Sequence, residues 1–259
     1  MPQLRRPLPR RLGHDEEASL VEHLTELRTR IIVVLCTLVG WFLLLFFAFR
    51  HTLIDWLSRP LPDDMDKPLT LGVAEPFTTS FNICLWASLA LSIPVIAWQA
   101  WAFLAPAFAP RSQKVVVRLV GVATVLLALG MAFAYWVVLP TSVNFLLNFD
   151  NDLYNTQIQA SKYYGFAAVM IFTVGLLFEM PIFIVGLSRL GIVSSDTLRR
   201  NRRIGYGLCV VVAVLLPGVD FVTMLLQTAP LLALFEVSIW AAVIAERRAA
   251  AAELAAGEI

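Results

Sequence analysis

Charged residues and cysteines are both scarce in this chain of 259 residues. Only 15% of the residues are charged, compared with about 25% in a soluble domain, and 59% are hydrophobic. The three cysteines, Cys36, Cys84 and Cys209, lie inside apolar segments and form no CxxC pair. This pattern argues against a disulfide framework and a cysteine metal site, so we expect all three to be buried small hydrophobic residues.

Sequence motifs of common enzymes are absent as well. The chain contains no GxxxxGK[ST] phosphate loop, no GxSxG and no HExxH, and its three histidines form no ligand cluster. We therefore expect no cofactor, no metal and no enzymatic activity. No internal repeat is visible, which weakens the case for a transporter built from inverted repeats.

The hydrophobic residues that dominate the chain are gathered in long, continuous runs. In lipid every backbone polar group must be satisfied internally, which leaves helices or a closed barrel, and continuous rather than alternating runs favour helices. Pro94 is expected to kink the second run, and Pro140 to end the third. We predict an all-α polytopic membrane protein with spans at residues 31–49, 80–104, 115–139 and 162–190, and two more helices within 204–245.

The positions of the basic residues predict the topology. They cluster in residues 5–30, 111–118, 189–203 and 247–248, and an excess of Lys and Arg marks cytoplasmic loops. Both termini and two loops are therefore predicted to be cytoplasmic. The chain must then cross the membrane twice between Arg203 and Arg247, with a break near Pro217 and Asp220. Residues 204–216 reach only about 20 Å as a helix, less than the roughly 30 Å of a hydrocarbon core.

The expected fold is a concave bundle of six transmembrane helices, N-in and C-in, with short fifth and sixth helices that thin the bilayer locally. Residues 1–18 are predicted to be a flexible cytoplasmic tail, residues 19–246 one membrane domain, and residues 247–259 a second cytoplasmic tail. The outer segment at residues 50–79 is too polar for lipid, and we expect it to form an external cap.

A charged, amphipathic stretch, SLVEHLTELRTR at residues 19–30, runs directly into the first span. Ser19 followed by Glu22 matches a capping box, so a helix is predicted to start here. Glu22 and Glu26 are neighbours at i and i+4, and acidic groups just outside the lipid are candidates for binding a basic ligand. The alternative for Glu26 is an ion pair with Arg30 on the same helix, which contributes only about 0.3–0.5 kcal/mol.

Several polar residues interrupt the later apolar runs. Glu179 is the sharpest case, since a charge at a helix centre costs about 2.5–3.5 kcal/mol on insertion scales, and such residues are functional candidates by default. The alternative is a structural hydrogen bond to a neighbouring helix. Asp220 fits either a functional acid or simple turn chemistry. Glu236 is another acid in an apolar run, and Thr223 and Gln227 lie one turn apart on one helix.

Four segments together resemble the TatC family, the receptor subunit of the twin-arginine protein translocase. They are HLTELRTR before the first span, EPFTTSFNICLWASLALSIPVIAWQAWAFLAPAF across the second, GMAFAYWVVLP ending the third and LFEMP in the fourth. The resemblance covers residues 19 to about 245. It implies binding of twin-arginine signal peptides and export of folded proteins across the cytoplasmic (inner) membrane, driven by the proton-motive force. The implied partners are the single-span subunits TatA and possibly TatB, with self-association in a larger complex and no role for nucleic acid.

The resemblance also assigns a binding surface for the signal peptide. Glu26 corresponds to the acid of the family motif HLxELRxR, and a carboxylate suits the planar donors of a paired arginine ligand. The other residues implied at this surface are Leu20, Glu22, Arg28, Gln99 and Phe103. The chain departs from the family in the loop PAFAPRSQK, where Ser112 stands in place of a glutamate. Either another carboxylate, such as Glu22, replaces that acid, or the arginine site is weaker or different.

The remaining family positions lie in the second half of the chain and in the outer cap. Glu179 matches a family glutamate before a proline and is expected to face the concave interior, in contact with the signal peptide or a partner helix. Thr223, Gln227 and Glu236 are expected to contact a single-span partner, although Met224 stands where the family has a glutamine. Asp220 and Pro60 match outer-loop positions. The alternative function is a small-solute or ion transporter gated by protonation of Glu179, against which the short last helices and the few polar groups at mid-depth argue.

Overall fold

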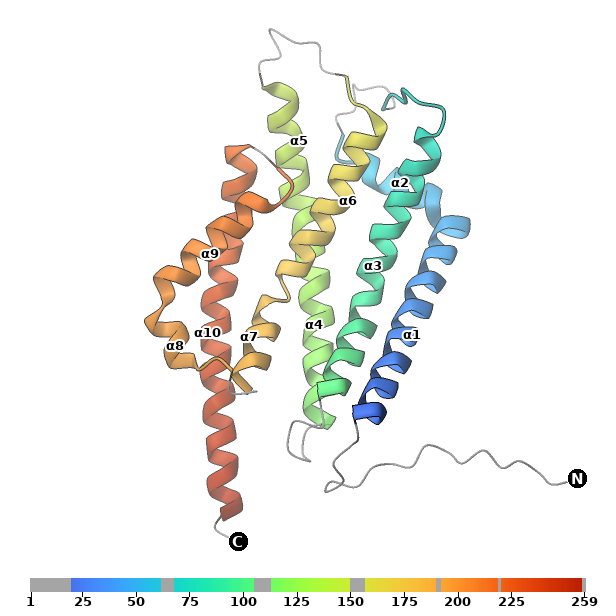
Figure 1. The fold of residues 1–259 in the computed structure, drawn as a ribbon. Coiled ribbons are helices and arrows are strands. Elements are labelled where there is room, and N and C mark those ends of the chain that lie inside the picture. The colour runs from blue at the N-terminus through green and yellow to red at the C-terminus, as the bar shows by residue number, and fades with distance from the viewer. Residues whose placement is uncertain are drawn as a thin grey trace, which may run out of the picture.

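A computed structural model describes residues 20–61, 68–104, 113–149, 157–189, 192–218 and 220–257 (Figure 1). Within these ranges the regular elements are helices, apart from an isolated parallel bridge between Leu69 and Gln159. The all-α prediction is therefore confirmed for the described residues, whereas the predicted tail at residues 1–18 lies outside them. We call the end of the bundle at which the first helix begins the basal end (bottom of Figure 1) and the opposite end the apical end.

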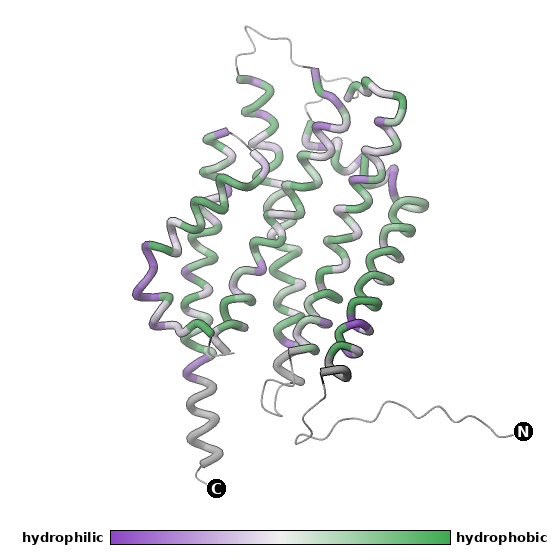
Figure 2. The backbone as a smooth tube through the Cα atoms, viewed as in Figure 1, coloured by the Kyte–Doolittle hydropathy of each residue, from purple (hydrophilic) through white to green (hydrophobic). Residues whose placement is uncertain are grey.

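Five helical segments are long and apolar enough to cross a membrane, namely Leu24–Ser58, Glu75–Phe103, Val117–Asn148, Ala160–Ser188 and Phe221–Arg247. Figure 2 shows hydrophobic residues along the shafts of these helices and most hydrophilic residues near their ends. This distribution is expected of helices whose middle lies in lipid and whose ends lie at the membrane surfaces.

The first helical segment consists of α1 (Leu20–Leu44), a π-helical turn (Leu45–Phe49) and α2 (Arg50–Ser58). Helix α1 packs against α3 (Glu75–Leu104) at the edge of the bundle. Only 6% of the most apolar 18 residues of the segment Leu24–Ser58 are buried. Consequently Cys36, on α1, is exposed, and the prediction of a buried residue is wrong there. It is right for Cys84 and Cys209.

Helix α2 belongs to the predicted outer cap and is fastened by tyrosines of the bundle. The hydroxyl of Tyr135 donates to the carbonyl of Trp56 at 2.8 Å, and that of Tyr163 donates to the carbonyl of Leu57 at 2.7 Å. The rings of Trp56 and Tyr135 stack with centroids 4.1 Å apart. These contacts satisfy the last carbonyls of α2 and hold it across the apical end of the helices. Pro60 lies just after α2, half-buried.

The third span does not end at Pro140, contrary to the prediction. Helix α4 (Gln113–Phe133) continues through a π-helical turn (Ala134–Val138) into α5 (Leu139–Asn148). Pro140 lies in the first turn of α5, where the π-helical turn has already interrupted the regular ladder of hydrogen bonds. A missing N–H is tolerated at such a position.

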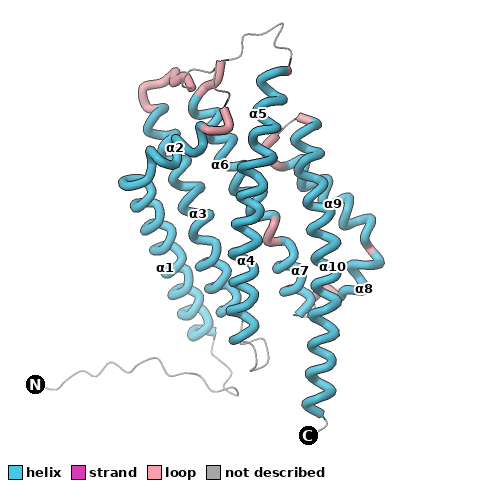
Figure 3. The backbone as a smooth tube through the Cα atoms, turned by 180° about the vertical axis from the view of Figure 1, so that it is seen from behind, coloured by secondary structure: helices cyan, strands magenta, loops and turns pink. Residues whose placement is uncertain are grey.

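The fourth span is interrupted instead. Helix α6 (Ala160–Leu177) ends at a turn formed by Phe178 and Glu179, and α7 (Met180–Arg189) follows with Pro181 in its first turn. Seen from behind in Figure 3, a loop separates α6 from α7, whereas the helix from α4 to α5 runs on. The proline accounts for the break, since its ring clashes with the carbonyl four residues earlier in a continuous helix.

The last part of the chain forms α8 (Ser195–Arg200), α9 (Arg202–Leu215) and α10 (Phe221–Gly257). Helix α9 has 14 residues and is short, as predicted. Helix α10 has 37 residues, so the prediction of a short sixth helix is wrong. Pro230 does not end it, and the alanine-rich sequence beyond Arg248 favours helix strongly. The boundary predicted at residue 246 thus falls inside α10, which packs against α7 and α9.

Candidate functional site

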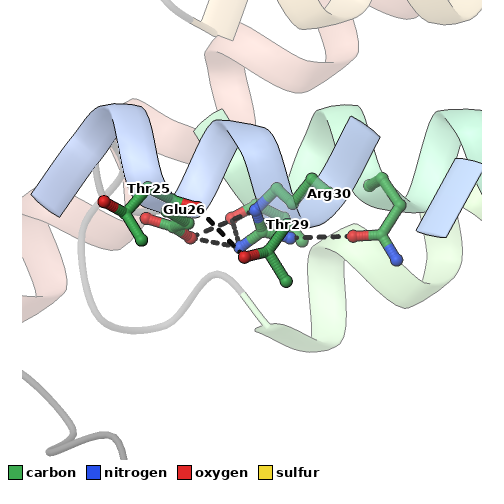
Figure 4. Close-up of polar contacts among 6 residues, drawn as sticks. Thr25, Glu26, Thr29 and Arg30 are labelled. Atoms are coloured by element: carbon green, nitrogen blue, oxygen red, sulfur yellow. Dashed lines mark hydrogen bonds and ion pairs between the residues drawn. The ribbon is translucent and has the colours of Figure 1, made fainter. Parts of the chain in front are cut away.

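An ion pair and its hydrogen bonds join α1 to α3 at the basal end (Figure 4). The Nε of Arg30 donates to Oε1 of Glu26 at 3.1 Å, and Nη2 of Arg30 contacts the same oxygen. On α3, Nη1 of Arg30 donates to Oε1 of Gln99 at 3.1 Å, and Nη2 donates to the carbonyl of Ala102 at 3.2 Å. One guanidinium therefore binds acceptors on two helices.

The two partners of this ion pair differ in exposure. The side chain of Arg30 is 22% exposed, whereas that of Glu26 is 40% exposed. The i,i+4 spacing on α1 brings Glu26 and Arg30 together, so the structural alternative recognised in the sequence is realised. The exposure of Glu26 leaves its carboxylate accessible from solution, whereas Arg30 is the more buried partner.

An apolar groove of about 390 Å³ lies beside this ion pair, between α1 and α3. Its walls include the apolar side chains of Leu27, Ile31, Val34, Ile96 and Phe103, together with the polar residues Arg30 and Gln99. A ligand that placed a cation at Glu26 would find hydrophobic surface directly next to it. Such a pairing suits a peptide with basic residues followed by apolar ones.

The structure therefore brings three of the predicted residues, Glu26, Gln99 and Phe103, to one place. Arg28 lies on the same helix as Glu26 and is exposed. Leu20 and Glu22 belong to the first turns of α1, but their side chains are outside the described part of the structure, as is Ser112. The role predicted for these residues stays a prediction.

Glu179 is buried at the break between α6 and α7. The residue is 3% exposed, and its Oε1 has no hydrogen-bond partner among the described residues. Its backbone carbonyl accepts from the amides of Ile182 and Phe183 at 3.0 and 3.2 Å, which starts α7. The structural alternative was a hydrogen bond from Glu179 to a neighbouring helix. Oε1 makes no such bond among the described residues. A buried oxygen without a donor is costly and is a candidate contact for a group from another molecule.

Thr223 and Gln227 are buried against their own chain. The amide of Thr223 donates to Oδ1 of Asp220 at 2.7 Å, which caps the start of α10, and its hydroxyl donates to that of Ser142 at 2.7 Å. Gln227 donates from Nε2 to the carbonyl of Pro217 at 3.0 Å, while its buried Oε1 has no partner among the described residues. Turn and cap chemistry, one of the two interpretations of Asp220, is therefore present.

Glu236 connects α10 to α9. Its Oε2 lies 3.2 Å from Nη2 of Arg202, and its Oε1 accepts a hydrogen bond from the hydroxyl of Tyr206. The acid in the apolar run is thereby neutralised by a basic residue from the start of the short helix.

The sequence analysis missed two residues that take part in polar contacts between helices, Ser142 and Glu246. Ser142 gave no signal, because a lone serine in an apolar run does not indicate a partner. Glu246 was missed too, although it accepts from the hydroxyl of Ser188 at 2.6 Å and from the amide of Ser195 at 2.8 Å. It thereby fixes the start of α8 against α7 and α10, and only its position beside Arg247 in a run of alanines could have drawn attention to it.

Comparison with known proteins identifies relatives across most of the chain. The profile of the family "Sec-independent protein translocase protein (TatC)" matches residues 22–230. The TatCd protein of Bacillus subtilis is 37% identical over 86% of this chain and 91% of its own length. The TatC proteins of Carboxydothermus hydrogenoformans and Escherichia coli K12 are 34% and 33% identical over 88% and 87% of this chain, and over 94% and 88% of their own lengths.

A solved structure agrees with these sequence relatives. A crystal structure described as the twin arginine translocase receptor TatC superposes with a TM-score of 0.75 at 28% identity, covering 87% of this chain and 100% of its own. The resemblance found in the sequence is therefore confirmed.

Proposed function

Because this chain belongs to the TatC family of Sec-independent protein translocase proteins, we propose that it is the receptor for twin-arginine signal peptides in a translocase of folded proteins. Members of this family are components of a protein translocase, and the family is not a recognised enzyme family. The observation that carries the proposal is the half-exposed carboxylate of Glu26, which already binds one guanidinium beside an apolar groove. A site that accepts the guanidinium of Arg30 has the chemistry to accept that of a ligand.

The proposed topology has six membrane crossings, with both termini in the cytoplasm. The short helix α9 supplies the crossing that the five long segments lack, and the basic residues near Arg30, Arg118, Arg200 and Arg247 support a cytoplasmic basal end. With this orientation Glu26 faces the compartment from which cargo arrives. The proposed energy source is the proton-motive force across the cytoplasmic (inner) membrane.

The proposed partners are the single-span subunits TatA and possibly TatB, together with further copies of this chain. Glu179 and Gln227 support such contacts, because each holds a buried oxygen without a partner among the described residues. Thr223 and Glu236, on the same helix as Gln227, are the other residues proposed for contact with a partner. The alternative, a small-solute or ion transporter gated by protonation of Glu179, is not favoured, because the chain belongs to a family of protein translocase components.

Replacement of the Glu26 carboxylate tests the receptor function. Glu26→Gln keeps the shape of the side chain but removes its charge, so we expect binding of a twin-arginine leader peptide to weaken by about tenfold to a hundredfold, the range for a hydrogen bond to a charged group. Export of a folded twin-arginine cargo should be lost in cells that carry only this variant. Peptide affinity is measured on the purified full chain in detergent, and export by cell fractionation.

The matched control is Asp196→Asn, which removes an exposed acid from α8. We expect it to bind and export as the parent does. Unchanged affinity in Glu26→Gln, or equal retention of a twin-arginine leader and its twin-lysine counterpart by the parent, contradicts the receptor function.

A further inference from the structure

One oxygen of the carboxylate proposed to receive the ligand is occupied by the chain's own arginine. Both Nε and Nη2 of Arg30 bind Oε1 of Glu26, so a guanidinium already pairs with this carboxylate. The opposite charges of Glu26 and Arg30 cancel within this contact. A dicationic peptide that approaches the basal end therefore meets a neutral pair, rather than an open anionic site.

We propose that Arg30 is an internal competitor for the Glu26 site, which has to release the carboxylate before a ligand arginine binds there. This inference rests on the proposed function, because it concerns the same carboxylate. It assigns Arg30 a defined effect on that function: the affinity of every ligand that uses Glu26 is lowered by the fraction of time that Arg30 occupies it.

The contacts of Arg30 with α3 make this release feasible. When Glu26 turns away, Arg30 retains the acceptors Oε1 of Gln99 and the carbonyl of Ala102, at 3.1 and 3.2 Å. The guanidinium is thus not left unpaired in its partly buried position. Glu26, the more exposed partner, has the freedom to turn toward the solvent and a ligand. The exchange replaces one guanidinium on Glu26 by another and keeps Arg30 on α3.

Competition of this kind has a signature that a positioning role lacks. A residue that only blocks Glu26 lowers the affinity of a twin-arginine and a twin-lysine leader by the same factor, so their ratio does not depend on it. The effect appears in the association rate, since the ligand must wait for the open state, and the dissociation rate is unaffected. A residue that orients Glu26 for arginine would instead strengthen binding of the twin-arginine leader and contribute to the ratio.

The test is the affinity of both leaders for the full-length Arg30→Gln chain in detergent. We expect binding of each leader to become about two- to fivefold tighter, the range for a half-exposed ion pair. The gain should come from faster association, and the ratio between the two leaders should stay as in the parent. Weaker binding of the twin-arginine leader, or a reduced ratio, overturns the proposal in favour of a positioning role.

Two further variants separate competition from general charge and from folding. Arg118→Gln removes an exposed cation of α4, and an equal gain there overturns the proposal, since the gain would then come from net charge. Arg30→Lys keeps the charge but cannot hold Glu26 and α3 together through one planar group. Arg30→Lys should give a smaller gain in affinity for both leaders, and it replaces Arg30→Gln as the test variant if Arg30→Gln does not fold.

The Glu26→Gln variant separates the two proposals. Weakened binding in Glu26→Gln together with no gain in Arg30→Gln refutes the internal competitor and leaves the receptor function standing. Unchanged binding in Glu26→Gln refutes both.

Discussion

The crossing of α4 and α6 depends on two glycines that let their backbones approach closely. A Cβ atom added to Gly130 would lie 2.9 Å from the Cα of Gly175 and 2.7 Å from Cγ of Phe178. Carbon atoms in contact are normally about 3.5–4.0 Å apart. The backbone of α6 cannot rotate away as a side chain can, so Gly130→Ala must push the two helices apart. Small residues commonly play this part where membrane helices cross.

Gly121, on the same helix, allows the size of this effect to be isolated. A Cβ added there meets nothing within 4 Å. Alanine favours helix over glycine by about 1 kcal/mol at either position, so this gain cancels when the two variants are compared. The difference left is the overpacking cost, about 1–3 kcal/mol. Gly130→Ala should therefore be less stable than Gly121→Ala by about that amount.

The assay is unfolding of the purified variants in one detergent, followed by tryptophan fluorescence. Gly121→Ala is expected to unfold at or above the midpoint of the parent, and Gly130→Ala clearly below it. The displaced contact includes Phe178, so the turn formed by Phe178 and Glu179 should shift as well. Equal midpoints for the two variants would refute the argument from close packing, because an added Cβ meets other atoms at Gly130 and none within 4 Å at Gly121.

Two further predictions concern acids in the second half of the chain. Glu246→Ala removes the acceptor of Ser188 and Ser195; we expect a loss of about 1–3 kcal/mol and faster proteolysis between α7 and α8. Glu246→Gln, which keeps one carbonyl oxygen, should lose less, and equal losses would show that the hydrogen bonds do not matter. Glu179→Ala should reduce cargo export, as measured by fractionation, more than leader binding, because Oε1 has no partner among the described residues and can serve a later contact. Crosslinks from position 179 that never capture leader or partner helix would contradict that role.

Much of the fold follows from the chain's hydrophobic pattern alone. Long apolar runs must become helices in lipid, since no water is present to satisfy the backbone. The capping box at Ser19 and Glu22 predicts the start of α1, and the break near Pro217 predicts that α9 is short. Charge and spacing also bring Glu26 and Arg30 together, because residues four apart on a helix are neighbours whatever the rest of the chain does.

Other features were decided by contacts between segments far apart in the sequence. Pro140 continues a helix while Pro181 interrupts one, although both are prolines in apolar runs, because a π-helical turn precedes only the first. The hydroxyl of Thr223, in the first turn of α10, donates to Ser142 from another helix, and Arg30 reaches Gln99 and Ala102 on α3. The sequence determined which segments are helices and which local pairs form, since these depend on nearby residues. Tertiary structure decided which polar atoms find partners and which, like Oε1 of Glu179, have none among the described residues, since that depends on what the packed helices bring within hydrogen-bonding distance.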